Sequence, residues 1–99
     1  RARHMKFSDK LAGDQRRTIL EALAQDSGYT HNTAILQMVL DEVGHNLSSA
    51  VIQSHCHYLA EQGLIDLTDD TTPVAKLTAR GLDVADGRAT ATGIARRRP

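Results

Sequence analysis

Three consecutive residues, His55-Cys56-His57, carry the clearest metal-binding chemistry in the chain, because imidazole and thiolate are preferred zinc ligands. They fall in a segment with helical periodicity, where neighbouring side chains point about 100° apart. The three side chains therefore cannot converge on one ion as they stand. A metal site would need a further ligand from elsewhere, such as His31 or His45. A small buried thiol that packs between helices explains Cys56 without a ligand role. We expect neither a metal site nor a cofactor.

The carboxylate pair Asp69-Asp70 is the one candidate for general acid–base catalysis. It lies in a run of Thr, Asp and Pro residues that is typical of a mobile turn, where no cavity would tune its protonation. The sequence contains no phosphate-binding glycine-rich loop, no nucleophile elbow and no HExxH motif. We therefore expect that the protein is not an enzyme.

Polar side chains on one face of residues 49–62 could instead read the edges of DNA bases. The helical period turns Ile52, Cys56 and Leu59 toward a core and leaves the opposite face outward. That outward face carries Ser49, Ala50, Gln53, Ser54 and His57. Gln pairs bidentately with adenine, and Ser or His can contact bases or phosphates. The segment contains no Lys or Arg, so a merely solvated polar face is the alternative.

Basic residues elsewhere could supply the phosphate contacts that this segment lacks. The candidates are Lys6, Lys10, Arg16, Arg17, Lys76 and Arg80. The run Arg96 to Arg98 could reach a groove as a flexible arm, although such a basic end is more often a solvated tail. Residues 5–95 carry 7 Lys and Arg against 12 Asp and Glu, a net charge of −5, so the folded body is acidic.

Apolar residues between positions 7 and 24 recur at helical spacing and predict a first helix. Ser8 is placed to cap it, Phe7 lies on its predicted buried face, and Gly13 could kink it. A Ser-Gly pair ends the helix, after which residues 29–30 could add a short extended piece to a sheet.

A second and a third helix, joined by a short turn, form a predicted helix-turn-helix. Asn32 caps the second helix, which stops at the glycine of position 44. Ser48 caps the third helix, over 49–62, and Leu47 and Ile52 have the spacing of a hydrophobic staple. The staple and the short turn fix the angle between the two helices.

Residues 64–67 and 74–77 have the composition of two strands, joined by a tip of turn-forming residues. Thr78 then caps a short closing helix that ends near Gly87. The predicted fold is mainly α with a small β-hairpin. In detail it is a winged helix-turn-helix with a three-helix core, a two-stranded wing and a short C-terminal helix.

The 99 residues suit one domain, and with 3% aromatic residues its core must be aliphatic. We assign residues 1–4 to an expression remnant, 5–87 to the domain and 88–99 to a disordered basic tail, because the isolated Ile94 offers too little apolar surface to order it. The single cysteine excludes an intramolecular disulfide. No apolar run approaches the ~20 residues of a membrane span, so we expect a cytoplasmic protein without a membrane partner.

The segment Tyr58 to Ile65, followed by Leu77 to Leu82, resembles the junction pattern of winged-helix transcriptional regulators. More narrowly, residues 7–93 resemble a family of short proteins of Mu-like prophages labelled ArsR-type regulators. The matching motifs are Asp14-Gln15-Arg16, Gly28-Tyr29 and Leu40 to His45. The sequence departs from that family at Gln53 and His55, where relatives place basic and acidic residues, and at Tyr58, where they carry Trp. The resemblance implies a winged-helix fold and a regulatory function.

The leading hypothesis is a sequence-specific DNA-binding regulator of phage origin that acts as a homodimer on a two-fold site. One such module covers only a few base pairs, and half-sites one helical turn apart require paired recognition helices. Leu11 and Val84 are the expected dimer contacts. The alternative is a winged helix that binds another phage or host protein and no DNA. The acidic body and the third helix without Lys or Arg favour this alternative.

Overall fold

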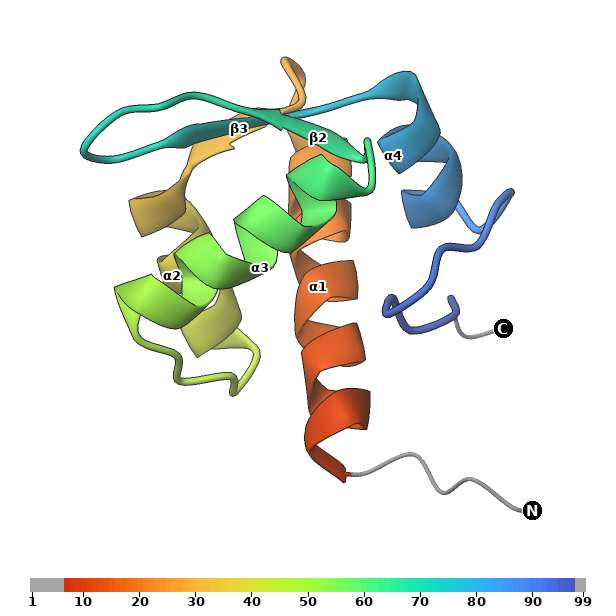
Figure 1. Ribbon diagram of the computed structural model, residues 1–99, viewed down its shortest axis with the longest axis horizontal. Helices are drawn as coiled ribbons and strands as arrows, with labels where there is room; N and C mark the ends of the chain where they lie inside the picture. Colours follow the sequence, from red (N-terminus) through yellow and green to blue (C-terminus); the bar gives the residue numbers. More distant parts are fainter. Residues whose placement is uncertain (1–6, 98–99) are drawn as a thin grey trace.

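The computed structural model describes residues 7–97, and within that range it contains four helices and one three-stranded antiparallel sheet (Figure 1). The elements are α1 (Phe7–Gln25), β1 (Thr30–Asn32), α2 (Thr33–Glu42), α3 (Ser49–Glu61), β2 (Ile65–Leu67), β3 (Val74–Leu77) and α4 (Ala79–Ala85). The predicted class, mainly helical with a small β-hairpin, is confirmed. This arrangement is compatible with a winged-helix-like fold. Residues 1–4, Lys6 and Arg98, assigned above to a remnant, a phosphate contact and an arm, lie outside the described residues.

The hairpin of β2 and β3 gains a third strand, because β1 pairs with the other side of β3 and the order is β1-β3-β2. The turn before β1 makes this pairing possible. There Asp26 Oδ2 accepts the backbone N–H groups of Gly28 and Thr30, and Tyr29 adopts a left-handed φ of 58°. The hydrogen bonds from Thr30 and Gly28 also lower the pKa of the Asp26 carboxyl. The extended piece predicted near residues 29–30 is therefore confirmed as a short strand, Thr30–Asn32.

Three predicted helix caps are confirmed by side-chain hydrogen bonds to the N–H group three residues later. Asn32 Oδ1 accepts from Ile35 at 2.8 Å, Ser48 Oγ from Val51 at 3.2 Å and Thr78 Oγ1 from Gly81 at 3.0 Å. These bonds fix the first turns of α2, α3 and α4.

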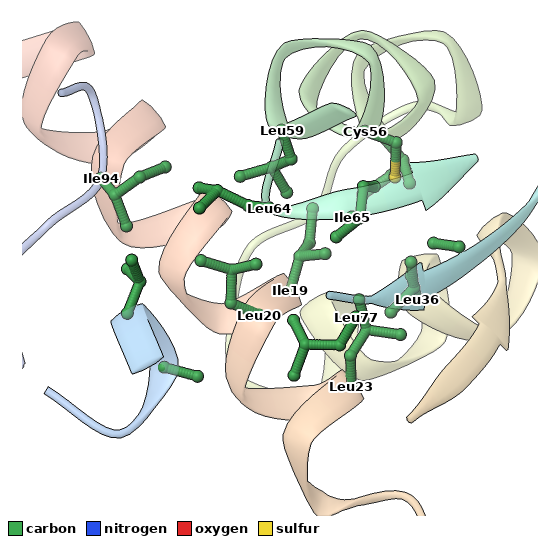
Figure 2. Close-up of a cluster of buried hydrophobic side chains, with 14 of the residues drawn as sticks. Ile19, Leu20, Leu23, Leu36, Cys56, Leu59, Leu64, Ile65, Leu77 and Ile94 are labelled. Carbon is green, nitrogen blue, oxygen red and sulfur yellow. The ribbon is translucent and has the colours of Figure 1, made fainter. Parts of the chain in front are cut away.

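An aliphatic core joins the helices to the inner face of the sheet (Figure 2). From α1 it takes Ile19, Leu20 and Leu23, and from α3 it takes the predicted buried residues, Ile52, Cys56 and Leu59. Each of these six side chains is fully buried. The buried face of α3 is thus as predicted, and its opposite face is left to solvent.

The N-terminal half of α1 differs from the prediction. The helix already includes Phe7, so Ser8 lies in its first turn and does not cap it. Phe7 is 75% exposed because the first turns of α1 extend beyond the rest of the molecule (Figure 1). α1 also continues through Gly13 as one helix. The missing side chain at Gly13 serves close packing instead, because a Cβ there would lie 3.2 Å from the backbone nitrogen of Ala95.

The largest departure concerns residues 88–97, which we call the strap. The prediction of a disordered tail is wrong for this segment, which folds back along α1 without forming a helix or strand of its own (Figure 1). Ile94 is 8% exposed and packs into the core, and the Ala95 N–H donates to Gly13 O at 3.2 Å. The composition of the segment did not predict this order, because the apolar contacts of Ile94 are made with residues that are distant in the sequence.

Candidate functional site

The outward face of α3 is the surface that sequence reasoning selected, and the structure leaves it accessible. Gln53 is half-buried, and the other members are exposed: Ser49, Ala50, Ser54 and His57. The start of the helix is held firmly by the Ser48 cap and by Gln37 Nε2, which donates to Leu47 O at 2.9 Å. A short, anchored turn after α2 therefore presents a polar helix face to solvent.

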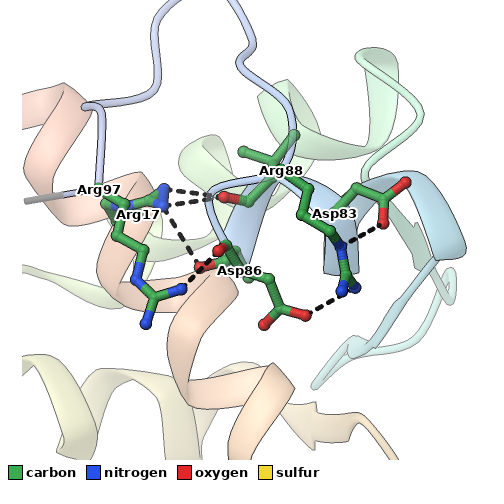
Figure 3. A network of polar contacts seen from close by, with 7 residues as sticks. Arg17, Asp83, Asp86, Arg88 and Arg97 are labelled. Carbon is green, nitrogen blue, oxygen red and sulfur yellow. Dashed lines mark hydrogen bonds and ion pairs between the residues drawn. The ribbon is translucent and has the colours of Figure 1, made fainter. Parts of the chain in front are cut away.

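Arg17 was predicted to contact phosphate, but it is buried inside the protein and the prediction is wrong. Its side chain is 7% exposed and caps the C-terminal end of α4 (Figure 3). The Nη1 and Nη2 groups donate to Val84 O at 3.2 and 2.8 Å, and Nη2 also donates to Ala85 O at 3.3 Å. Nε lies 3.3 Å from Glu21 Oε2, which supplies the counter-charge. Buried in this way, Arg17 is not accessible to a phosphate ligand.

Arg16, the other predicted phosphate contact on α1, also makes its contacts within the protein. Its guanidinium lies 3.9 Å from the centre of the Tyr58 ring, a cation–π arrangement. Nε donates to His55 Nδ1 at 3.1 Å and Nη1 donates to Gly93 O at 3.0 Å. Arg16 thus joins α1, α3 and the strap and does not point outward as a phosphate contact.

His55 is a buried, hydrogen-bonded residue whose burial the sequence analysis did not predict. It is 6% exposed and lies between α1 and α3. Because Arg16 can only donate, Nδ1 of His55 must be the acceptor, so Nε2 carries the proton and donates to Gln15 Oε1 at 2.8 Å. Burial, followed by the charge of Arg16, lowers the pKa of His55 to about 4. Its spacing from Ile52 and Leu59, three and four residues, was the available signal.

Two predicted phosphate contacts, Lys76 and Arg80, are exposed. Lys76 lies in the central strand, opposite Asp66 on one side and Thr30 on the other. Arg80 Nε donates to Gln62 O at 3.2 Å, which places Arg80 at the C-terminal end of α3. Both cations are accessible, but neither lies beside the first turn of α3.

Charge on the remaining surface is mostly negative. Residues 7–97 carry 8 Lys and Arg against 12 Asp and Glu, a net charge of −4. The exposed tip of the hairpin holds Asp69 and Asp70. Arg88 pairs with Asp83 and Asp86, at 3.4 and 2.9 Å. A ligand with many negative charges would therefore meet few unpaired cations.

Within residues 7–97, no three His, Cys, Asp or Glu side chains are grouped so that they could hold a metal ion. Cys56 and His57 illustrate why, since Cys56 is fully buried while His57 is exposed. Burial also raises the pKa of the Cys56 thiol to about 11, which disfavours the thiolate that binds metals. None of the helices in this part of the chain is both long and apolar enough to cross a membrane.

Two proteins resemble the chain over most of its length. The gp26 protein of Escherichia phage Mu is 42% identical over 94 residues, which cover 94% of this chain and 97% of gp26. A protein of Haemophilus influenzae is 36% identical over 80 residues, which cover 79% of this chain and 78% of that protein. Both are described only as uncharacterized, and neither description mentions ArsR-type regulators or winged helices. No protein-family model and no solved structure matches the chain.

Proposed function

The chain belongs to the family of gp26 of Escherichia phage Mu, and we propose that it is a winged-helix DNA-binding protein that regulates phage transcription. The observation that supports this proposal most is the exposed polar face of α3, which follows α2 through a short anchored turn. The order of helices and strands, with a β2–β3 hairpin after α3, is compatible with a winged helix-turn-helix and supports the proposal.

On this proposal α3 enters the major groove, which is wide enough to admit one helix. The N-terminal residues of such a helix meet base edges, so Ser49, Ala50 and Gln53 are placed to read sequence. Gln53 would pair with adenine, while Ser54 and His57 would contact bases or the adjoining phosphates. Lys10, Lys76 and Arg80 are exposed and remain as predicted phosphate contacts within residues 7–97, because Arg16 and Arg17 are engaged internally.

The protein would act as a dimer, because one α3 covers only a few base pairs and a two-fold site needs two. Val84 was predicted to take part in the dimer contact, but it is 1% exposed and belongs to the core. Leu11 is half-buried, and Phe7, one turn earlier on α1, is exposed. These two apolar residues on the projecting end of α1 are the dimer contact that we propose.

The test is selection from random duplexes by the purified protein, followed by affinity measurements on the enriched site. Gln53→Ala and His57→Ala should each weaken binding about tenfold, because a good base contact is worth ~1–3 kcal/mol. His45→Ala is the matched control, because His45 lies in the turn and off the proposed reading face. If no duplex is enriched at low salt, or if the control loses as much affinity, the proposal is wrong.

A second candidate function, binding to another protein, is favoured by the surface of α2. Met38 and Val43, which follows that helix, are 61% and 59% exposed, and Ile35 adds a further exposed apolar side chain. The acidic hairpin tip and the lack of Lys and Arg on α3 also suit a protein partner better than a phosphate backbone. The duplex selection separates the two candidates, since only the first requires an enriched DNA site.

A further inference from the structure

We propose that the strap holds α3 in its orientation against α1, with Arg16 and Tyr58 as positioning residues. The strap thereby fixes the direction in which the outward polar face of α3 points. The part of this inference that concerns DNA rests on the proposed function. The part that concerns α3 is a property of the folded chain and can be measured without DNA.

Arg16 is the residue through which the three segments meet. From α1 it donates to His55 on α3 and to Gly93 O in the strap, while its guanidinium lies against the ring of Tyr58. The His55 bond is geometrically demanding, because it uses Nε and fixes the plane of the guanidinium. A strap that moved away would remove the acceptor that holds Nη1 and free the group to leave His55.

Tyr58 makes the second connection between the strap and α3. Its hydroxyl donates to Thr92 O at 2.7 Å. The next residue, Gly93, has a φ of +80°, and a Cβ there would come within 2.2 Å of the Tyr58 oxygen. Only glycine therefore allows the strap to lie this close to α3.

The strap is attached more weakly than the core elements that it touches. Ile94 is the one apolar side chain of the strap that is buried in the core, Ala89 and Ala91 are only partly buried against it, and the hydrogen bonds of the strap to Arg16 and Tyr58 are solvent-exposed. A hollow of about 540 Å³ lies beside it, lined by the N-terminal half of α1 and by residues 92–95. Segments with few buried contacts and exposed hydrogen bonds open locally before the whole domain unfolds. Release of the strap is therefore an event separate from unfolding.

The consequence for α3 follows from how that helix is held. Its described side-chain hydrogen bonds to α1 run through His55, which accepts from Arg16 and donates to Gln15. Loss of the strap would remove the support of Arg16 and the Tyr58 hydroxyl bond together. The middle of α3 would then rely on the single His55–Gln15 bond and on Ile52, Cys56 and Leu59, whose apolar contacts do not fix direction.

The experiment compares amide hydrogen exchange in the wild-type chain and in two variants. Gly93→Ala places a methyl group against Tyr58, and Tyr58→Phe removes only the hydroxyl bond. In both, amides of the strap and of residues 52–58 should exchange at least about tenfold faster, while the rest of α1 keeps its protection. Using two variants of different severity keeps the test valid if Gly93→Ala does not fold.

The matched controls repeat each change away from the strap. Gly63→Ala imposes the same left-handed strain at a position with open space around it, and it lies at the end of α3. Tyr29→Phe removes a hydroxyl from the other tyrosine. Protection of residues 52–58 should be retained in both. Unchanged exchange of these amides in Gly93→Ala and Tyr58→Phe, whether or not the strap opens, would overturn the inference.

The two proposals fail in different ways. If the α3 amides respond as expected but no duplex is enriched, the DNA-binding function is wrong and the positioning role stands. If an enriched duplex is found and Tyr58→Phe binds it as tightly as the wild type with unchanged exchange, the positioning role is wrong and DNA binding stands. The expected result is weaker duplex binding together with faster exchange.

Discussion

Arg16 and Arg17 are neighbours of the same type, but they have different structural roles. A guanidinium has several N–H donors in a fixed plane, so it satisfies backbone carbonyls as readily as phosphates. Arg16 faces α3 and the strap, and Arg17 faces the end of α4. Each is engaged by groups that only the folded chain brings near, and neither remains a surface cation.

His55 leads to a prediction about acid stability. Its pKa is about 4 in the folded chain against an ordinary 6.5, so the unfolded chain binds the proton more readily between these values. The free energy of unfolding should therefore decrease as the pH falls from 6.5 to 4, by at most about 3 kcal/mol, and this term should not change further below pH 4. Urea denaturation at a series of pH values measures it.

His55→Gln should flatten this part of the pH profile, because Gln can still bond to Gln15 and Arg16 but does not titrate. His57→Gln is the control, since His57 is exposed on the same helix. A profile that keeps its full slope in His55→Gln would show that another group is responsible.

At the scale of elements, α4 depends on its neighbours. With seven residues it is too short to be stable alone. Arg17 caps its last carbonyls from α1, Arg97 from the strap donates to Asp86 O, and Arg88 pairs with Asp83 and Asp86 (Figure 3). The C-terminal end of a helix carries partial negative charge, so these cations stabilise it.

Arg17→Ala should therefore lower the free energy of unfolding by about 3 kcal/mol, because it leaves the Val84 and Ala85 carbonyls and Glu21 without their partner. Lys10→Ala on the exposed side of the same helix should change it by less than about 0.5 kcal/mol. Chemical denaturation of the three proteins measures the difference. Equal effects would mean that Arg17 contributes no more than a surface cation.

At the scale of the whole molecule, we expect the projecting end of α1 and the acidic surface to determine how two copies of the chain associate. An apolar side chain that is 75% exposed, Phe7, lies at the N-terminal end of α1, which projects beyond the other elements (Figure 1). A two-fold contact uses the same patch on both protomers, and the pair Phe7 and Leu11 offers such a patch. Like charges elsewhere oppose closer contact between copies.

We predict that the protein sediments as a dimer at micromolar concentration and that Phe7→Glu converts it to a monomer, because two buried carboxylates would face each other. Met38→Glu is the matched control, an exposed apolar residue on α2. Analytical ultracentrifugation reads the result. If Met38→Glu dissociates the dimer and Phe7→Glu does not, the interface lies on α2. If the wild type is a monomer, the predicted dimer does not exist.

The sequence by itself determined the order and bounds of most elements, because the signals involved act over a few residues. Asn32, Ser48 and Thr78 each cap a helix through an N–H group three residues away, and the apolar period of α3 identifies its buried face. The accessible part of the candidate site, the outward face of α3, follows from that same period.

The tertiary structure alone decided the roles that depend on distant partners. Arg16 bonds to a residue 77 positions away and Arg17 to one 67 positions away, so neither could be told from a surface cation by its neighbours. Ile94 looked isolated in its own segment and is buried because the fold brings it against the core beside α1 and α4 (Figure 2). Local composition cannot report the free energy of a contact whose other half lies elsewhere in the chain.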